Sequence, residues 1–189
     1  MPKDIPVSNG NLLFNFDSDY RIRDIYFPLI GQENHTRGHP FRFGVWVDGR
    51  CSWIGPEWKK DLRYHDNSLV TDVFLKNEAL GLELRCFDVV DLDLNVYIKK
   101  VEVTNLEERD RQMRLLFTHD FHLYGNDIGD TAYFDPRTRS IIHYKANRYF
   151  LINCSRGGKD GVDYFACGIK ETEGEEAARK DAEDGELSG

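Results

Sequence analysis

The 189-residue sequence lacks the features that mark several large classes of protein. It has no apolar run of membrane-spanning length, and its first residues, Met-Pro-Lys-Asp-Ile-Pro, lack the charged-then-apolar layout of a secretion signal. It also has no basic stripe of the kind that binds nucleic acid or an anionic membrane surface. From these absences we expect a cytoplasmic protein that has neither nucleic acid nor a membrane among its partners.

Cysteine is scarce, and its spacing excludes two kinds of chemistry. The four cysteines are Cys51, Cys86, Cys154 and Cys167, and no two of them form a C-x-x-C pair, which argues against a zinc ribbon and a thioredoxin-like site. Cys86 continues a row of alternate leucines and is expected to be a small buried hydrophobe. A Cys154–Cys167 disulfide stays open, although a reducing compartment disfavours it. Phosphate-binding loops and serine or cysteine nucleophile motifs are absent as well.

Negative charge is concentrated at the C-terminal end. The formal net charge is −8, and residues 170–189, with eight acidic and three basic residues, account for −5 of it, which leaves −3 for the rest. This segment pairs Glu175 with Arg179 and Glu176 with Lys180 at i,i+4 but contains few apolar residues. We therefore predict one domain over residues 1–170. Residues 171–189 are expected to be an acidic, short helical or irregular tail that starts a connection to a segment outside this sequence.

Alternation of apolar and polar residues is the dominant pattern before residue 170, and no convincing amphipathic helix appears there. Turn signals separate the alternating segments at regular intervals, which is typical of an antiparallel sandwich. The predicted strands cover residues 12–16, 22–27, 41–47, 51–54, 68–75, 80–90, 96–104, 111–121, 131–134, 141–144, 149–154 and 164–169. The fold class that we predict is all-β, and the sequence leaves open whether the sandwich is complete.

Two loops, residues 31–40 and 118–136, are unusually rich in polar side chains. The second contains two histidines, four aspartates and two tyrosines. Because ordering such a loop costs conformational entropy, we expect the loops to serve a purpose, and we predict that they form a domain interface or an active-site rim. The candidate residues are Glu33, Asn34, His35, Arg37, His39, Asp120, His122, Tyr124, Asp127 and Asp130.

The same loop residues have two alternative interpretations. His122, Asp127 and Asp130 have the donor types of a metal site, and clustered aspartates could include the acid and base of a glycosidase. Loop carboxylates more often accept hydrogen bonds from the backbone of turns, and the separation of carboxylates cannot be derived from sequence. We therefore predict no metal, no cofactor and no catalytic residue in this chain. His119 falls on the apolar face of its predicted strand and is expected to be a core histidine.

Tryptophans close together in the sequence suggest a different function. Aromatic faces stack on the apolar surface of sugar rings, so Trp53 and Trp58 are candidates for binding an α-glucan. Ordinary core packing is the competing interpretation.

Several segments together resemble the N-terminal region of prokaryotic family 15 glycoside hydrolases, the glucoamylase-like and trehalase-like enzymes. The longest are Asn15-Phe-Asp-Ser-Asp-Tyr-Arg-Ile-Arg-Asp-Ile-Tyr-Phe-Pro28 and Gly38-His-Pro-Phe-Arg-Phe-Gly-Val-Trp-Val47. Shorter ones are Gly31-Gln-Glu-Asn-His35, His119-Asp-Phe-His122, Gly129-Asp-Thr-Ala-Tyr133 and residues 181–189. Each piece is short, but as a set they extend over nearly the whole chain.

The resemblance implies an antiparallel, galactose mutarotase-like supersandwich followed by an (α/α)6 barrel that carries two catalytic glutamates. No barrel-like helical pattern occurs here, so the expected role is that of a non-catalytic N-terminal domain. Its parent would hydrolyse α-glucosidic bonds of glucans, maltooligosaccharides or trehalose with inversion, and its partners would be the barrel and an α-glucan. Exposed sheet edges also invite self-association. A free-standing carbohydrate-binding module and a mutarotase-like or epimerase-like sugar enzyme, with His119 or His122 as general acid, stay open as alternatives.

Overall fold

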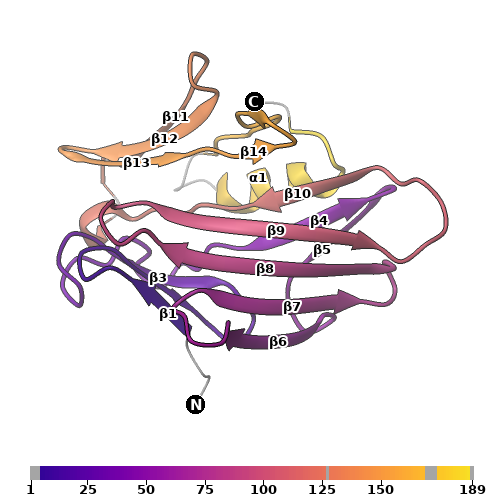
Figure 1. Ribbon diagram of the computed structural model, residues 1–189. Helices are drawn as coiled ribbons and strands as arrows, with labels where there is room; N and C mark the ends of the chain where they lie inside the picture. The colour runs from indigo at the N-terminus through magenta and orange to yellow at the C-terminus, as the bar shows by residue number, and fades with distance from the viewer. Residues whose placement is uncertain (1–4, 127, 169–173, 188–189) are drawn as a thin grey trace.

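The protein is described here from a computed structural model, which covers residues 5–126, 128–168 and 174–187, with the backbone alone for 174–177. The described chain is almost entirely β-structure, arranged in antiparallel sheets (Figure 1). The largest sheet has the strand order β6-β7-β8-β9, formed by β6 (Lys59–Tyr64), β7 (Thr71–Asn77), β8 (Leu82–Val90) and β9 (Tyr97–Asn105). The all-β, antiparallel prediction is confirmed.

Two smaller sheets face the large one. The first contains β1 (Ile5–Ser8), β2 (Leu13–Phe16) and β3 (Ile22–Tyr26), and the second contains β10 (Met113–Phe117), β4 (Phe43–Val47) and β5 (Arg50–Trp53) in that order. A single bridge between Ile22 and Phe41 connects the two sheets. Together they form one layer of a sandwich whose other layer is the large sheet.

The core lies between these layers. Alternate residues of the central strands β7 and β8 point inward, and the pairing of Leu75 with Leu84 and of Val73 with Cys86 brings apolar side chains side by side. Phe14, Phe16 and other inward residues of the facing sheets complete one continuous cluster. Burial raises the pKa of the Cys86 thiol to about 11, which fits the small buried hydrophobe that was predicted, and all four cysteines are free.

A third sheet lies above β9 and β10 in the view of Figure 1, and the helix contacts β5. The sheet contains β11 (Thr131–Asp135), β12 (Ser140–Lys145) and β13 (Arg148–Ile152), and a small hairpin of β14 (Ser155–Arg156) and β15 (Lys159–Asp160) follows. Helix α1 (Gly174–Glu183) buries Ala182 against Trp46 and Leu116. This contact supplies the partner that a helix with so few apolar residues needs.

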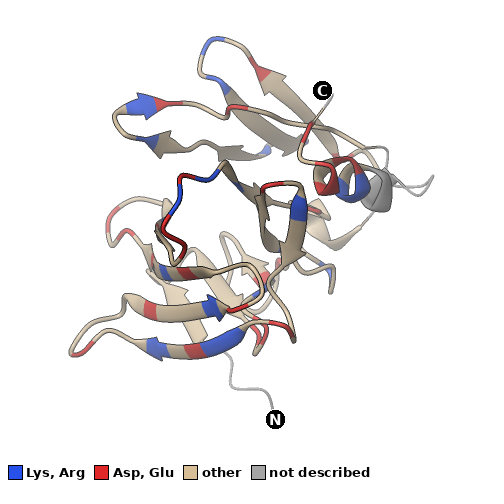
Figure 2. Cartoon of the chain, turned by 90° about the vertical axis from the view of Figure 1, so that its right-hand side faces the viewer, with Lys and Arg blue, Asp and Glu red and all other residues tan. Residues whose placement is uncertain are grey.

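Acidic and basic residues are interspersed along the strands and along α1 (Figure 2). The described part of the chain therefore presents no stretch of one sign in this view, in agreement with the absence of a basic stripe from the sequence. None of the helices within the described ranges has the length and apolar character needed to cross a membrane.

Several predicted strands need correction. Strands β1 and β6 were not predicted; β6 has the sequence Lys-Lys-Asp-Leu-Arg-Tyr, and as the edge strand of its sheet it needs few apolar residues. The strand predicted over residues 111–121 ends at Phe117, where the chain turns into the polar loop. Residues 164–168 form no strand, and residue 169 lies outside the described residues, as do the side chains of Glu175 and Glu176 in the predicted i,i+4 pairs.

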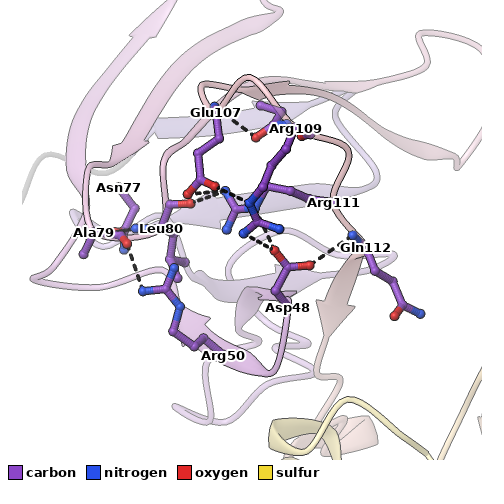
Figure 3. Close-up of polar contacts among 10 residues, drawn as sticks. Asp48, Arg50, Asn77, Ala79, Leu80, Glu107, Arg109, Arg111 and Gln112 are labelled. Carbon is purple, nitrogen blue, oxygen red and sulfur yellow. Dashed lines mark hydrogen bonds and ion pairs between the residues drawn. The ribbon is translucent and has the colours of Figure 1, made fainter.

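One end of the sandwich is held together by a buried arginine (Figure 3). The side chain of Arg111 is 0% exposed, and its guanidinium donates to Oδ2 of Asp48 at 3.0 Å and to the carbonyl oxygen of Leu80 at 2.6 Å. It also lies 3.3 Å from Oε1 of Glu107. Three turns, those after β4, β7 and β9, are therefore tied to one cation. The more exposed Arg109 pairs with the same two carboxylates from outside.

The sandwich is open along one side, between β9 and β10. These consecutive strands are edge strands of different layers, and neither pairs with a further strand in the part of the chain that is described. Apolar side chains along this opening are exposed: Val103 by 39%, Leu115 by 37% and Phe117 by 44%. We call these three residues, with the two strand edges, the open seam.

We call Arg109 and Arg111, with Asp48 and Glu107, the arginine clasp. Its two arginines provide a matched test of its contribution to stability. We expect Arg111→Ala to lower the free energy of unfolding several times more than Arg109→Ala, because it removes a fully buried side chain and leaves the Leu80 carbonyl oxygen without its donor. Arg109 is 59% exposed, so water screens its ion pairs with the same carboxylates. Urea unfolding of both variants measures the difference, and equal losses would contradict the clasp.

Candidate functional site

The two polar loops predicted from sequence lie against each other, joined by the fully buried side chain of His35. The Nε2 atom of His35 is 2.6 Å from the carbonyl oxygen of Phe27, and its Nδ1 atom accepts a hydrogen bond at 3.3 Å from the backbone N–H of Tyr124, 89 positions away. The carbonyl oxygen of His35 accepts a further bond at 2.8 Å from the backbone N–H of His122. One histidine thus sets the positions of both loops.

These contacts require a neutral ring with its proton on Nε2. Burial lowers the pKa of His35, and the Phe27 carbonyl and the nearby Glu33 carboxylate oppose that shift only in part. Since Nδ1 must accept the Tyr124 N–H, a second ring proton would remove the bond between the loops. The lowered pKa and the geometry therefore agree.

A hydrogen-bonded turn shapes the first loop. The side chain of Asn34 accepts from the backbone N–H of Thr36 at 3.0 Å and donates to Asp24 of strand β3 at 2.8 Å. The Thr36 hydroxyl donates to the carbonyl oxygen of Arg23 at 2.6 Å. Asn34 thus orients the loop and is not free to contact a ligand.

The hairpin of β12 and β13 also contributes side chains to the site. The sequence did not predict this contribution. Arg148 of β13 binds both carboxylate oxygens of Glu33, at 3.0 to 3.2 Å, and lies over the Tyr124 ring. Lys145 of β12 donates to the carbonyl oxygen of Leu123 at 3.0 Å and lies 3.7 Å from Asp130. Both cations lie at the ends of the turn at residues 145–148. Because this turn is distant in sequence from the two loops, the sequence did not predict that these residues contact them.

Tyr124 has an unusual backbone conformation within the second loop. It belongs to the short helical turn η1 (Leu123–Gly125), where its φ is +59°. For a bulky aromatic residue this left-handed region costs on the order of 1 kcal/mol and needs support from the surroundings. The support comes from His35 and Asn147, which bind its N–H and its hydroxyl group, and from Asp130, which accepts the Leu123 N–H at 3.0 Å.

His39, Asp120 and His122 form a second cluster, which we call the imidazole–carboxylate cluster. Oδ2 of Asp120 lies 3.2 Å from Nδ1 of His39 and 3.2 Å from Nε2 of His122. The two imidazole rings stack with their centroids 4.1 Å apart and their planes at 23°. His39 is exposed, with 48% of its side chain accessible, whereas Asp120 and His122 are nearly buried.

Of the ten candidate interface residues, eight are thus brought together by the fold. Arg37 lies in the same loop, exposed, with a φ of +48°. Asp127 lies outside the described residues. Of the clustered aspartates, Asp135 accepts bonds from Thr138 in its own turn, as loop carboxylates commonly do.

Of the two tryptophan candidates for sugar stacking, Trp58 needs correction. Trp58 is 2% exposed in the core, where its indole N–H donates to Ser52, so it has no ring face to offer a sugar. Trp53 lies across Gly44 of the neighbouring strand, where a Cβ atom would come within 2.7 Å of its ring. Its indole N–H donates to Glu183 of helix α1 at 3.2 Å. Trp58 thus serves core packing, which was the competing interpretation, whereas sugar stacking on the partly buried Trp53 stays a prediction.

A buried ionic network inside the sandwich was not predicted. Asp88, fully buried, accepts hydrogen bonds from Tyr20 at 2.5 Å and from Thr71 at 2.8 Å, and it pairs with Lys99 at 2.7 Å. The hydroxyl group of Tyr97 also donates to it. Burial, and then the Asp88 charge, raise the pKa values of both tyrosines. The sequence did contain a signal for this network. Asp88 continues the inward row of β8 through Leu84 and Cys86, and a carboxylate at such a position must be paired.

A small cavity beside this network is lined by Tyr20, Lys99, Phe117 and His119 among others. Its volume is about 20 Å³, room for one water molecule but far below the roughly 300 Å³ of a small ligand pocket. His119 packs among Phe41, Phe121 and His143, and burial lowers its pKa to about 4, in keeping with a neutral core histidine.

Comparison with known proteins gives two similarities, whereas no protein-family model matches the chain. An uncharacterized glycosyl hydrolase of Methanocaldococcus jannaschii is 24% identical over 164 residues, which are 86% of this chain and 25% of that protein. A crystal structure of a bacterial glucoamylase complexed with acarbose matches with a TM-score of 0.64 and 14% identity, over 81% of this chain and 25% of that one. The chain thus spans about a quarter of each, and the resemblance predicted from sequence is confirmed at the level of the fold.

The lowered pKa of His119 predicts a specific loss of stability in acid. Between pH 6.5 and about pH 4 the unfolded chain binds a proton at this histidine and the folded chain does not, so the free energy of unfolding falls as the pH falls. We expect His119→Gln to remove on the order of 2 kcal/mol of that fall.

Urea unfolding at pH 7 and at pH 4.5 measures this effect as a difference between wild type and variant, so that the other histidines cancel. A difference that does not change with pH would show that His119 titrates normally in the folded chain.

Proposed function

We propose that this chain is the non-catalytic N-terminal β-sandwich domain of a glucoamylase-like glycoside hydrolase. Its parent would hydrolyse α-glucosidic bonds of glucans, maltooligosaccharides or trehalose with inversion, using an (α/α)6 barrel as catalytic domain. The sandwich would support the barrel and shape the entrance of its active site. A cytoplasmic location is part of the same proposal, and it rests on the sequence alone.

One observation carries the proposal: two loops far apart in sequence are ordered against each other into a polar surface built around His35. The ordering includes a left-handed Tyr124 and a buried histidine, both of which cost free energy. Arg37 and His39 remain exposed at its rim, where a neighbouring domain would contact them. Interdomain contacts within a chain are typically polar in this way.

Carboxylates of the two loops already bind other groups of the fold, which supports a non-catalytic role. An inverting glycosidase needs one carboxyl group as acid and another as base, with space for sugar and water between them. Glu33 uses both of its oxygens on Arg148, and Asp130 accepts the Leu123 N–H beside Lys145. The cavity near His119 is too small for a sugar ring.

The open seam supports a larger assembly. Exposed apolar side chains along two unpaired strand edges are unfavourable in water and favour contact with another part of the same protein. Self-association through the same edges is the alternative use of this surface. A free-standing carbohydrate-binding module is less well supported, since Trp58 is buried and Trp53 packs on Gly44 and binds Glu183.

The proposal is tested by comparing this chain with the complete product of its gene. We expect the isolated chain to leave maltooligosaccharides and trehalose intact and the complete protein to hydrolyse one of them, with the β-anomer of glucose appearing first in proton NMR spectra. Turnover by the isolated, purified chain would overturn the non-catalytic role. A complete protein without glycosidase activity would overturn the proposed family function.

In the complete protein, the loops should matter for catalysis without contacting the reacting bond. We expect Glu33→Gln, which removes the ion pair with Arg148, to lower kcat/KM at least tenfold, because a displaced rim misplaces the substrate. Glu78→Gln is the matched control, since Glu78 pairs with Lys59 on the exposed surface far from the loops in the fold. Equal kinetics of both variants would contradict a role for this surface.

A further inference from the structure

We propose that the imidazole–carboxylate cluster is a zinc site, with Nδ1 of His39, Oδ2 of Asp120 and Nε2 of His122 as ligands. Each of the three residues offers a ligand atom within 4.8 Å of the others, and Oδ2 of Asp120 is 3.2 Å from Nδ1 of His39 and from Nε2 of His122. In a tetrahedral zinc site with bonds of about 2.0–2.1 Å, neighbouring ligand atoms are about 3.3–3.4 Å apart. The carboxylate is thus already at ligand spacing from both imidazoles.

The donor set selects zinc over the common hard cations. Two imidazole nitrogens and one carboxylate oxygen suit zinc, whereas magnesium and calcium prefer sites made of oxygen atoms. Three protein ligands leave a fourth position, which is the arrangement in which zinc binds a water molecule or a group from a partner. His39, with 48% of its side chain exposed, is the ligand through which solvent or a partner would reach a bound ion.

Two of the three ligands are held in place before any metal binds. The side chains of Asp120 and His122 are only 10% and 7% exposed, and the His122 backbone is fixed by its hydrogen bond to His35. The first loop is held as well, because the His39 N–H donates to the carbonyl oxygen of Thr36 at 2.8 Å. Preorganised ligands lose little entropy on binding a metal.

Because the rings of His39 and His122 are stacked, one of them must move before both can bind a zinc ion. An imidazole binds a metal in the plane of its ring, and the two planes here are nearly parallel, at 23°. One ring must therefore turn out of the stack, and the exposed His39 has the room to do so. This movement makes the site weaker than a closed structural zinc site with four ligands.

Isothermal titration of the whole, chelator-treated chain with zinc chloride tests the proposal, in a Cys154→Ser, Cys167→Ser background that removes the exposed thiols. We expect one zinc ion per chain and no binding of magnesium or calcium. His39→Ala and Asp120→Asn should each weaken zinc binding by roughly 100-fold or more. His65→Ala, at an exposed histidine outside the cluster, should bind zinc as the background does.

Cobalt provides a second, spectroscopic readout of the ligand geometry. Bound Co²⁺ should show the intense visible absorption of a tetrahedral site, and His39→Ala should abolish it while the circular dichroism spectrum stays that of the folded chain. Absence of zinc binding, binding that survives His39→Ala, or loss of binding in His65→Ala would each overturn the proposal.

Discussion

The arrangement of the candidate site depends on one buried imidazole. His35 uses a ring donor, a ring acceptor and both of its backbone groups, which bind Ile25 and His122, so that four contacts position two loops from one residue. A buried histidine is stable in this role only if it is neutral and fully hydrogen-bonded, and burial itself lowers its pKa. Burial and hydrogen bonding therefore fix both the protonation state and the geometry of His35. Because His35 binds the backbone of His122, it also positions Asp120 and His122, the proposed zinc ligands of the second loop.

The pairing of β4 with β10 relates this site to the arginine clasp. The register places Phe43 opposite Phe117 at one end and Val47 opposite Met113 at the other. The polar loops continue from the first end, and the turn with Asp48 and the segment with Arg111 continue from the second (Figure 3). A slip of one residue would turn each side chain to the opposite face and would misalign both ends at once. The arginine clasp and the polar loops thus lie at opposite ends of the β4–β10 pair, and both depend on the same register.

Period-two alternation was sufficient to predict the fold class and most strands, and polar density was sufficient to find both loops. What the sequence could not provide was which distant segments meet. His122 was considered with Asp127 and Asp130, its neighbours in sequence, whereas the fold brings His39 to it and engages Asp130 elsewhere. Lys145 and Arg148 were missed for the same reason. Trp58 was mistaken because aromatic composition does not distinguish a buried ring from an exposed one.

The open seam and the polar loops are continuous on the surface, which links their functions. Phe117 is the last residue of β10, it stacks on Phe43 with the ring centroids 4.9 Å apart, and the second loop begins at the next residue, Thr118. Thr118 in turn exchanges hydrogen bonds with Arg42, two residues after the first loop. A partner that covers Phe117 must therefore pass beside both loops. A domain that completes the seam would reach the rim formed by Arg37 and His39, whereas a partner that contacts only that rim would leave apolar surface exposed.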